Sequence, residues 1–323
     1  MRLLKSLLLA GVLFSGLSSR PFRPQEAQTA PSDFEARCRA PGVVRCFGFD
    51  DPAELRRHLE PAWNGIYRGE MDTQVKASGR GSLRFTIPPF SPANTSGSFW
   101  MEFADDLSVQ FGQGEEFYVQ WRQRFSPEML STHYEDGNGW KQAIVGEGSR
   151  PGHTAASCTP IHLVVEDTYQ DGAPRMYHSC GIKDDRYEPL EVLRGSHLIQ
   201  NAVGCPHNRV KSPPCVMYKA NQWMTFQLHV KPGAWYKNDR KYHHDSTVQL
   251  WVGEEGKPSK LVIDMSPERG TGYDLVNLDP AAKYGKVWLL PYNTHKNARQ
   301  DHPTAYTWYD ELIISRQRIA DPR

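Results

Sequence analysis

The sequence lacks any marked excess of one charge. Its 323 residues carry 38 Lys and Arg against 37 Asp and Glu, which gives a net charge of +1. Proteins that bind nucleic acids neutralise phosphates with clustered basic side chains, and no such cluster stands out, so the composition argues against nucleic-acid binding. The sequence also has no phosphate-binding loop and no Gly-x-Ser-x-Gly turn, the motifs of P-loop nucleotide hydrolases and α/β-hydrolases.

Long apolar runs are missing apart from one at the very start of the chain. Met1–Ser19 has a basic beginning, an apolar run over Leu7–Phe14 and small residues at its end. This pattern is typical of a secretory signal peptide and is too short for a membrane span. We therefore expect a protein secreted to the periplasm or the exterior, without membrane contact. Residues 20–41 are expected to form a flexible lead-in and residues 42–323 a single domain.

Cysteine is scarce, and none of the six cysteines belongs to a Cys-x-x-Cys pair. The usual ligand spacing of a zinc site is therefore absent. An even number of cysteines in a secreted chain favours disulfides, although the sequence leaves their connectivity open. Proximity in the sequence favours three local pairs: Cys38–Cys46, Cys158–Cys180 and Cys205–Cys215.

The chain does contain many short segments in which apolar and polar residues alternate. The clearest is Phe117–Phe125, which reads FYVQWRQRF. Alternate side chains of a strand point to opposite faces, so this segment predicts an apolar face with Phe117, Val119, Trp121 and Phe125. The opposite, polar face would carry Tyr118, Gln120, Arg122 and Arg124. The polar face suits either a groove floor for an acidic, hydroxyl-rich ligand or the ordinary solvated side of a sheet.

About thirteen such segments occur, separated by turns rich in Gly and Pro, and they predict an all-β sandwich in one domain. Residues 181–220 have little periodicity and contain two cysteines. We expect them to form a long loop held by disulfides, since loops of this length in compact domains are usually functional or disordered.

Four segments resemble the concanavalin-like jelly roll of secreted polysaccharide lyases, laminarinase-type hydrolases and laminin-G-type lectins. They are residues 79–88 (GRGSLRFTIP), 116–129 (EFYVQWRQRFSPEM), 223–233 (WMTFQLHVKPG) and 306–315 (YTWYDELIIS). The resemblance spans roughly residues 42–316. It implies a β-sandwich of two antiparallel sheets and leaves the activity open, because such folds host many functions.

The hydrolases of this superfamily carry a Glu-x-Asp-x-x-Glu strand, which this chain lacks. The adjacent pairs Glu166-Asp167 and Asp310-Glu311 point to opposite faces of their strands, so neither pair can flank one glycosidic bond. Hydrolysis is thereby disfavoured but not excluded, because carboxylates from different strands can still meet.

The resemblance to the lyases implies an Arg, a Gln, a His and a Tyr on neighbouring strands. Arg122, Gln142, His162 and Tyr292 follow this order. Two features depart from the lyase pattern: the Gln-x-His tripeptide is split between two segments, and an unfamiliar PYNTHK replaces the Tyr motif.

These four residue types suit β-elimination in a uronic acid polymer. The reaction removes the C5 proton next to a carboxylate, so the carboxylate must be neutralised, and we assign that role to Arg122 and Gln142. His162 would be the base and Tyr292 the acid or base. Each of the four also has a purely structural interpretation, as a solvated or packing side chain.

Further residues are expected to bind the sugar chain through charges, hydrogen bonds and aromatic rings: Tyr118, Gln120, Arg124, Trp140, Lys141, Trp251 and His295. Asp50 and Asp310 are candidates for a structural calcium ion, as in several superfamily relatives. The sequence thus predicts a secreted, monomeric lyase of an acidic polysaccharide such as alginate or glucuronan. A non-catalytic, lectin-like jelly roll and a glycoside hydrolase with dispersed carboxylates remain as alternatives.

Overall fold

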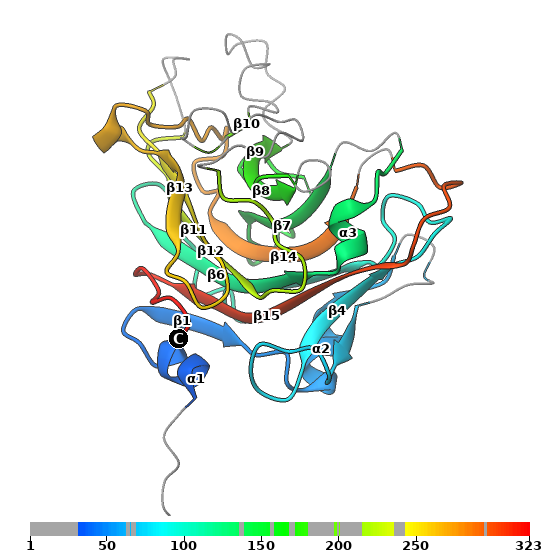
Figure 1. Cartoon of the computed structure of the whole chain (residues 1–323). Helices are drawn as coiled ribbons and strands as arrows, with labels where there is room; N and C mark the ends of the chain where they lie inside the picture. Colours follow the sequence, from blue (N-terminus) through cyan, green and yellow to red (C-terminus); the bar gives the residue numbers. More distant parts are fainter. Residues whose placement is uncertain are drawn as a thin grey trace, which may run out of the picture. The chain divides into compact units, whose positions relative to one another are not determined.

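Two antiparallel β-sheets packed face to face form the described part of the chain (Figure 1). The computed structural model describes residues 32–323, except 63–64, 66–68, 136–138, 156–157, 168–171, 180–196, 199, 201–214, 236–242 and 294–295. The predicted signal peptide lies outside these residues and stays a prediction. The expected jelly-roll sandwich of two antiparallel sheets is confirmed.

The first sheet has eight strands, and neighbours in the following order are hydrogen-bonded. They are β13 (Lys260–Met265), β12 (Thr247–Gly253), β11 (Met224–Lys231), β6 (Phe117–Phe125), β15 (Ala305–Ser315), β4 (Ser82–Ile87) and β3 (Glu70–Asp72), while β1 (Val43–Phe47) also pairs with β15.

The second sheet has seven strands. In order they are β10 (His197–Leu198), β9 (Arg175–Ser179), β8 (His162–Asp167), β7 (Trp140–Glu147), β14 (Tyr284–Tyr292), β5 (Ser98–Glu102) and β2 (Leu59–Glu60). Short helices complete the described residues: α1 (Asp33–Cys38), α2 (Pro52–His58), α3 (Pro127–Ser131) and the 3₁₀ turn η1 (Pro267–Arg269).

The alternation of β6 places its apolar residues in the core between the sheets, as predicted. Phe117, Val119, Trp121 and Phe125 are all buried there. Burial of a large apolar side chain contributes about 2 kcal/mol to folding. Tyr118, Gln120, Arg122 and Arg124 therefore lie on the outer face of the eight-stranded sheet. Gln123 has the parity of the apolar residues and lies in the interior with them.

The N-terminal helix α1 corrects the expectation of a flexible lead-in over residues 20–41 for its described part, residues 32–41. Ser32 caps this helix and forms a capping box with Glu35, which satisfies two helix-end N–H groups. Arg37 is 5% exposed and donates to Gln120 Oε1 (2.7 Å) and to Glu311. The helix is therefore fixed to the outer face of the eight-stranded sheet, because a buried arginine needs such partners.

The predicted disulfide between Cys38 and Cys46 is confirmed, and it ties α1 to β1. Cys158 and Cys215 are also disulfide-bonded. Cys180 and Cys205 lie outside the described residues, so the pairing of these four stays a prediction. Among the described helices, none is long and apolar enough to cross a membrane.

Candidate functional site

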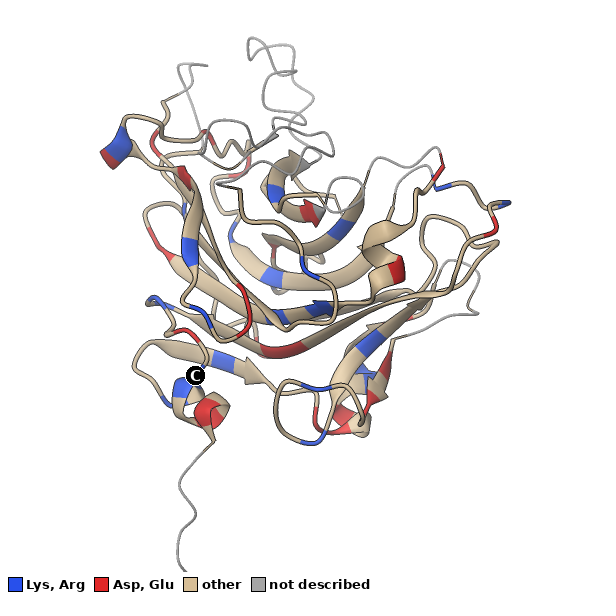
Figure 2. Cartoon of the chain, viewed as in Figure 1, with Lys and Arg blue, Asp and Glu red and all other residues tan. Residues whose placement is uncertain are grey.

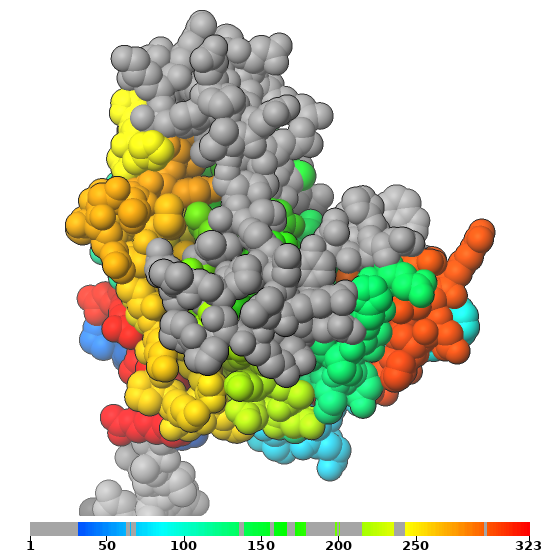
Figure 3. All heavy atoms as spheres, turned by 45° about the horizontal axis from the view of Figure 1, so that its top comes forward, coloured from blue at the N-terminus to red at the C-terminus, as the bar shows by residue number. Residues whose placement is uncertain are grey.

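The outer face of the seven-stranded sheet carries the most promising group of polar side chains. Its central strands β7 and β14 are bowed in Figure 1, and the outer face of the sheet is the one turned away from the eight-stranded sheet. Figure 3 brings this side forward, with the segment around β13 on one flank and α3 with the orange-red segment after β14 on the other. Figure 2 marks basic residues on the ribbons of both β7 and β14.

Four polar residues on four adjacent strands lie directly opposite one another. Tyr292 on β14 faces Lys141 on β7, Lys141 faces Glu166 on β8, and Glu166 faces Arg175 on β9. Directly opposed residues on one sheet face have Cβ atoms about 5 Å apart. We call Tyr292, Lys141, Glu166 and Arg175 the polar row.

A β-bulge in β7 gives Lys141 its direction. The register with β8 shifts between Lys141, which faces Glu166, and Ala143, which faces Val165, so Gln142 is an extra residue. A bulge leaves one residue without a ladder partner and changes the direction of its neighbours. Both Gln142 and Ala143 consequently face the interior, while Lys141 faces outward beside Glu166 and Tyr292.

The charges of the polar row influence one another. Arg175 Nε donates to Glu166 Oε1 at 2.5 Å, yet burial raises the pKa of Glu166 to about 7 against the opposing effects of Arg175 and Lys141. Burial also lowers the pKa of Lys141, and the charge of Glu166 opposes that shift. With Glu166 ionised, two cations face one carboxylate, so the row carries a net positive charge suited to an anionic ligand.

Lys141 and Tyr292 are the members of the polar row that reach solvent. Both side chains are partly exposed, whereas Glu166 and Arg175 are buried. The Nζ atom of Lys141 lies 4.9 Å from the centre of the Tyr292 ring, which is a cation–π contact. An ammonium group and a phenol are therefore adjacent at the surface, with a buried ion pair on the two strands next to Lys141.

A second row, of apolar residues, runs beside the polar row on the same face. Trp100 on β5 faces Trp288 on β14, Trp288 faces Ile144 on β7, and Ile144 faces Val164 on β8. Tyr177 on β9 continues the row opposite Val164. Trp100 and Tyr177 are partly exposed, and rings of this kind are suited to stacking on sugars.

His162 lies on the same face as Lys141 and Tyr292 but outside the polar row. Its ring covers Gly146, where a Cβ atom would lie 2.2 Å from His162 Cδ2, and it contacts Trp288 edge to face at 5.0 Å. It is only 2% exposed, and burial, with nearby Lys141, lowers its pKa to about 3. His162 is therefore a neutral, buried histidine at neutral pH.

The expectation that Arg122, Gln142, His162 and Tyr292 share one trough is wrong for Arg122 and Gln142. Arg122 lies on the outer face of the eight-stranded sheet, on the opposite side of the sandwich from Tyr292. Gln142 is fully buried between the sheets, where its Oε1 accepts from Gln123 Nε2 at 2.6 Å. Its backbone carbonyl accepts from the Tyr309 hydroxyl at 2.8 Å.

The residues expected to bind sugar are likewise divided. Lys141 belongs to the polar row, and Trp140 is a core residue packed against Tyr134. His295 lies outside the described residues. The others are on the outer face of the eight-stranded sheet: Tyr118, Gln120, Arg124 and Trp251. Of these, Gln120 is fully buried beneath Arg37 and donates to the carbonyl of Ala320.

Glu166 and Arg175 were not singled out from the sequence as a pair. A usable signal was present, because both lie in alternating segments that form the β8–β9 hairpin. Residues Glu166 and Val164 of β8 and Arg175 and Tyr177 of β9 occupy one face of it. The sequence did not reveal the register that brings them opposite Lys141.

The two predicted calcium ligands have another role in the structure. Asp50 accepts from the backbone N–H groups of Arg80 and Gly81, and Asp310 accepts from those of Ala77 (2.7 Å) and Ser78 (3.3 Å). The two carboxylates thus hold one turn from both sides through N–H donors, which a cation would have to displace. These residues fit a calcium ion poorly, and calcium binding stays an untested prediction.

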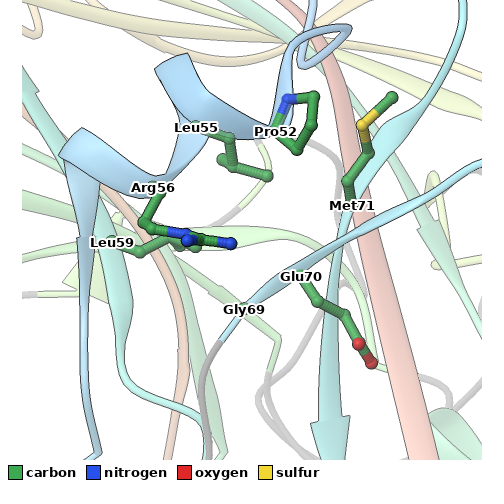
Figure 4. Close-up of a pocket in the computed structure, with 7 residues that line it drawn as sticks. All are labelled: Pro52, Leu55, Arg56, Leu59, Gly69, Glu70 and Met71. Carbon is green, nitrogen blue, oxygen red and sulfur yellow. The ribbon is translucent and has the colours of Figure 1, made fainter.

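The rest of the described structure offers less for catalysis than the polar row does. The described residues contain no cluster of three or more His, Cys, Asp or Glu side chains that could hold a metal ion. A pocket of about 330 Å³ lies between α2 and β3, with Arg56 and Glu70 on its rim and an otherwise largely apolar lining (Figure 4). It contains no residue of the polar row.

Comparisons with known proteins inform the fold. The sequence matches no protein-family model and no curated protein. Among solved structures, an alginate lyase from Aplysia kurodai is 12% identical over 84% of this chain and 98% of that one, with a TM-score of 0.53. An endo-β-1,4-glucuronan lyase from Trichoderma reesei is 14% identical over 76% of this chain and 86% of that one (TM-score 0.43). A glycoside hydrolase family 131 domain from Coprinopsis cinerea is 12% identical over 87% and 98%, respectively (TM-score 0.41).

At 12% identity, the match to the alginate lyase establishes shared architecture alone. The sheet order and the alginate lyase match together show that the chain has the concanavalin-like jelly-roll fold.

Proposed function

We propose that the protein is a secreted polysaccharide lyase that cleaves a uronate-containing glycan by β-elimination at the polar row. The observation that carries the proposal is the alignment of Tyr292, Lys141, Glu166 and Arg175 on adjacent strands of one sheet face. Such a row offers cations for a carboxylate together with a phenol for proton transfer. Export is supported by the disulfides, which persist in oxidising compartments.

Lys141 is proposed to neutralise the substrate carboxylate. The C5 proton of a uronate becomes acidic enough to leave only when the negative charge that develops on the carboxylate is stabilised. Lys141 is partly exposed; burial lowers its pKa, and the charge of Glu166 opposes that shift. A partly buried ammonium group acts through a lower effective dielectric than one in bulk water, so its effect on the developing charge is stronger.

Tyr292 is proposed to transfer the protons. Its ring lies against the Lys141 ammonium, 4.9 Å from the ring centre, so a carboxylate bound by Lys141 would lie next to the phenol. The deprotonated tyrosine can take the C5 proton, and the phenol that results can give this proton to the leaving glycosidic oxygen. The C5–H and C4–O bonds break, the C4–C5 double bond forms, and no water is consumed.

Glu166 and Arg175 are proposed to position Lys141. Their ion pair is buried on β8 and β9, the two strands next to Lys141 on the same sheet face. Loss of Arg175 would leave Glu166 buried without its closest cation, a change that costs about 3–5 kcal/mol in comparable pairs. These two residues therefore act through Lys141 and do not themselves transfer the proton.

The experiment is incubation of the purified protein with polyuronates of different composition, alginate and glucuronan among them. Elimination creates an unsaturated uronate, which is measured by its ultraviolet absorbance. Lys141→Ala and Tyr292→Phe should each slow the absorbance increase by about a hundredfold or more, while Lys257→Ala, which removes an exposed charge on another loop, should leave it unchanged. An unchanged rate in both site variants would refute the proposal.

Glycoside hydrolysis is the second candidate, and Glu166 is the observation that favours it. A carboxyl group with a pKa of about 7 is suited to act as a general acid. Hydrolysis yields new reducing ends without ultraviolet absorbance, so the same incubation separates the two reactions. Retention on the polymer with neither product would support a non-catalytic binding protein.

A further inference from the structure

The outer face of the eight-stranded sheet, on the other side of the sandwich from the polar row, carries a second ordered row. Arg84 on β4 faces Trp308 on β15, and Trp308 faces Arg124 on β6. A tryptophan therefore lies between two arginines on three adjacent strands, whose spacing is about 4.8 Å. We call Arg84, Trp308 and Arg124 the arginine–tryptophan row.

Aromatic packing holds this row in a fixed geometry. Trp308 donates through Nε1 to Asp72 Oδ2 at 2.9 Å, so its indole cannot rotate freely. Tyr306, two residues earlier on β15, stacks on Trp308 with ring centres 5.7 Å apart and planes inclined by 29°. The guanidinium carbon of Arg84 lies 5.6 Å from the centre of the Tyr306 ring. The partly exposed ring of Tyr306 is consequently a fixed surface.

The arginines of this face differ in how fully their charges are paired. Arg84 contacts Glu70 (2.5 Å) and Asp72 (3.3 Å). Arg124, by contrast, makes one long hydrogen bond to Asn221 (3.5 Å) and no ion pair with any described residue. Its guanidinium group is partly exposed, so it retains unused capacity for a carboxylate.

Arg122 adds to the same face, two residues from Arg124 on β6. Its nearest carboxylates, those of Glu255 and Glu311, are both 3.9 Å away, and its buried Nε has no hydrogen-bond partner among the described residues. Its guanidinium carbon lies 6.0 Å from the centre of the Trp223 ring. Within the described part of the chain, acidic groups therefore compensate Arg122 only loosely and form no ion pair with Arg124.

We propose that the arginine–tryptophan row, with Tyr306, is a second, non-catalytic binding surface for an acidic glycan. A sugar ring would stack on Tyr306 while its carboxylate binds the fork of Arg124. A ring beside an incompletely paired arginine complements a uronate, which combines an apolar ring face with a carboxylate. The choice of a uronate polymer rests on the proposed function, whereas the surface itself is independent of catalysis.

The position of this surface determines how it would act. The two sheets are about 10 Å apart, and a hydrophobic core fills the space between them. A glycan segment therefore cannot contact both outer faces without passing around the edge of the sandwich. The second surface would therefore hold one part of a polymer network while another part occupies the polar row. Binding at two sites raises avidity for long or cross-linked polymers and leaves short oligosaccharides unaffected.

The test uses the full chain in Lys141→Ala form, in which turnover does not consume the ligand. Migration is measured by electrophoresis in native gels that contain polyuronate. The Lys141→Ala protein is compared with a protein that carries Arg124→Ala and Tyr306→Ala in addition. We expect the added pair to weaken retardation about tenfold, the effect of losing one charge-assisted hydrogen bond. Arg39→Ala, which removes an exposed arginine outside the row, is the matched control and should not change retardation.

The remaining outcomes separate this proposal from the catalytic one. Retardation unchanged by the Arg124 and Tyr306 substitutions, or equal retardation in a neutral glucan gel, would overturn the second surface. In otherwise wild-type protein, the Arg124→Ala and Tyr306→Ala substitutions together should raise KM for long polymer but not for short oligouronates. If wild-type protein yields no unsaturated product but the gel result holds, the lyase proposal fails and the binding surface stands.

Discussion

Lys141 lies directly opposite Tyr292 across the β7–β14 pair, with its ammonium nitrogen 4.9 Å from the centre of the tyrosine ring. Both residues are partly exposed on a sheet face whose other residues are largely buried. A cation next to a phenol is the smallest set of groups that can both neutralise a uronate carboxylate and move its C5 proton. The first two predictions concern this pair.

Substitutions at Lys141 distinguish a cation from a base. Lys141→Ala should lower kcat/KM on a polyuronate by about 10²–10³, typical of losing one preorganised charge. Lys141→Arg keeps the positive charge but cannot act as a neutral base, so it should retain most of the activity that Lys141→Ala loses. An arginine variant as inactive as the alanine variant would show that Lys141 itself takes the proton.

Tyr292→Phe removes only the hydroxyl group. It should reduce kcat by about 10²–10⁴, the usual contribution of a positioned acid or base, with little change in KM, because the ring against Lys141 is retained. Tyr118→Phe, at a partly exposed tyrosine of the other sheet, is the matched control. Loss of affinity without loss of kcat in Tyr292→Phe would mean that the hydroxyl binds substrate instead of transferring protons.

His162 should make the protein sensitive to acid. Its folded-state pKa is about 3 against an ordinary value of 6.5, so the folded protein binds this proton less tightly than the unfolded chain. Stability from this group is complete above pH 6.5 and is lost as the pH falls toward 3. His162→Gln should flatten the fall of Tm between pH 6 and 4, whereas the exposed His133→Gln should not; equal slopes in all three proteins would contradict the assignment.

Glu166 should have the opposite pH dependence. Its folded-state pKa of about 7 exceeds the ordinary value of 4.5, so folding favours its protonated form. The stability contribution is complete below pH 4.5 and is lost as the pH rises through 7. Glu166→Gln should therefore gain stability relative to wild type as the pH increases over this range, as measured by urea unfolding. A wild-type slope retained in the variant would rule out Glu166 as its source.

Asp310 tests the calcium prediction. Asp310→Asn should lower the unfolding free energy by about 1–3 kcal/mol, because an amide cannot accept all the N–H groups of Ala77, Ser78 and Glu311 that the carboxylate accepts. Since these donors already occupy the carboxylate, we expect added calcium or a chelator to have little effect on Tm. A rise in Tm with calcium that Asp310→Asn abolishes would instead support a calcium site.

The sequence predicted the fold because periodicity is a local property. The alternation in Phe117–Phe125 correctly assigns each apolar side chain to the core, since one face of the strand must be buried. Periodicity does not say which of two sheets a strand joins. Arg122 and Lys141 were therefore assigned to one groove although they lie on opposite sides of the sandwich.

The site was predictable in part for the same reason. Lys141 and Tyr292 were both expected to contact substrate, and they are adjacent in the structure. Gln142 was assigned wrongly, because a bulge that turns one residue inward leaves no mark in the composition of the strand. The α1 helix was missed because Arg37 anchors it through partners distant in the sequence, Gln120 and Glu311.

Because β7 has an extra residue, Lys141 can point outward while Gln142, the next residue, makes hydrogen bonds in the interior. In a regular strand of the same length, Lys141 would point into the core and Trp140 toward solvent. Deletion of Gln142 would restore simple alternation with Lys141 still facing outward, while Gln123 and Tyr309 lose Gln142 Oε1, the acceptor that they share. One shortened strand thus offers a way to destabilise the sandwich while its surface chemistry stays in register.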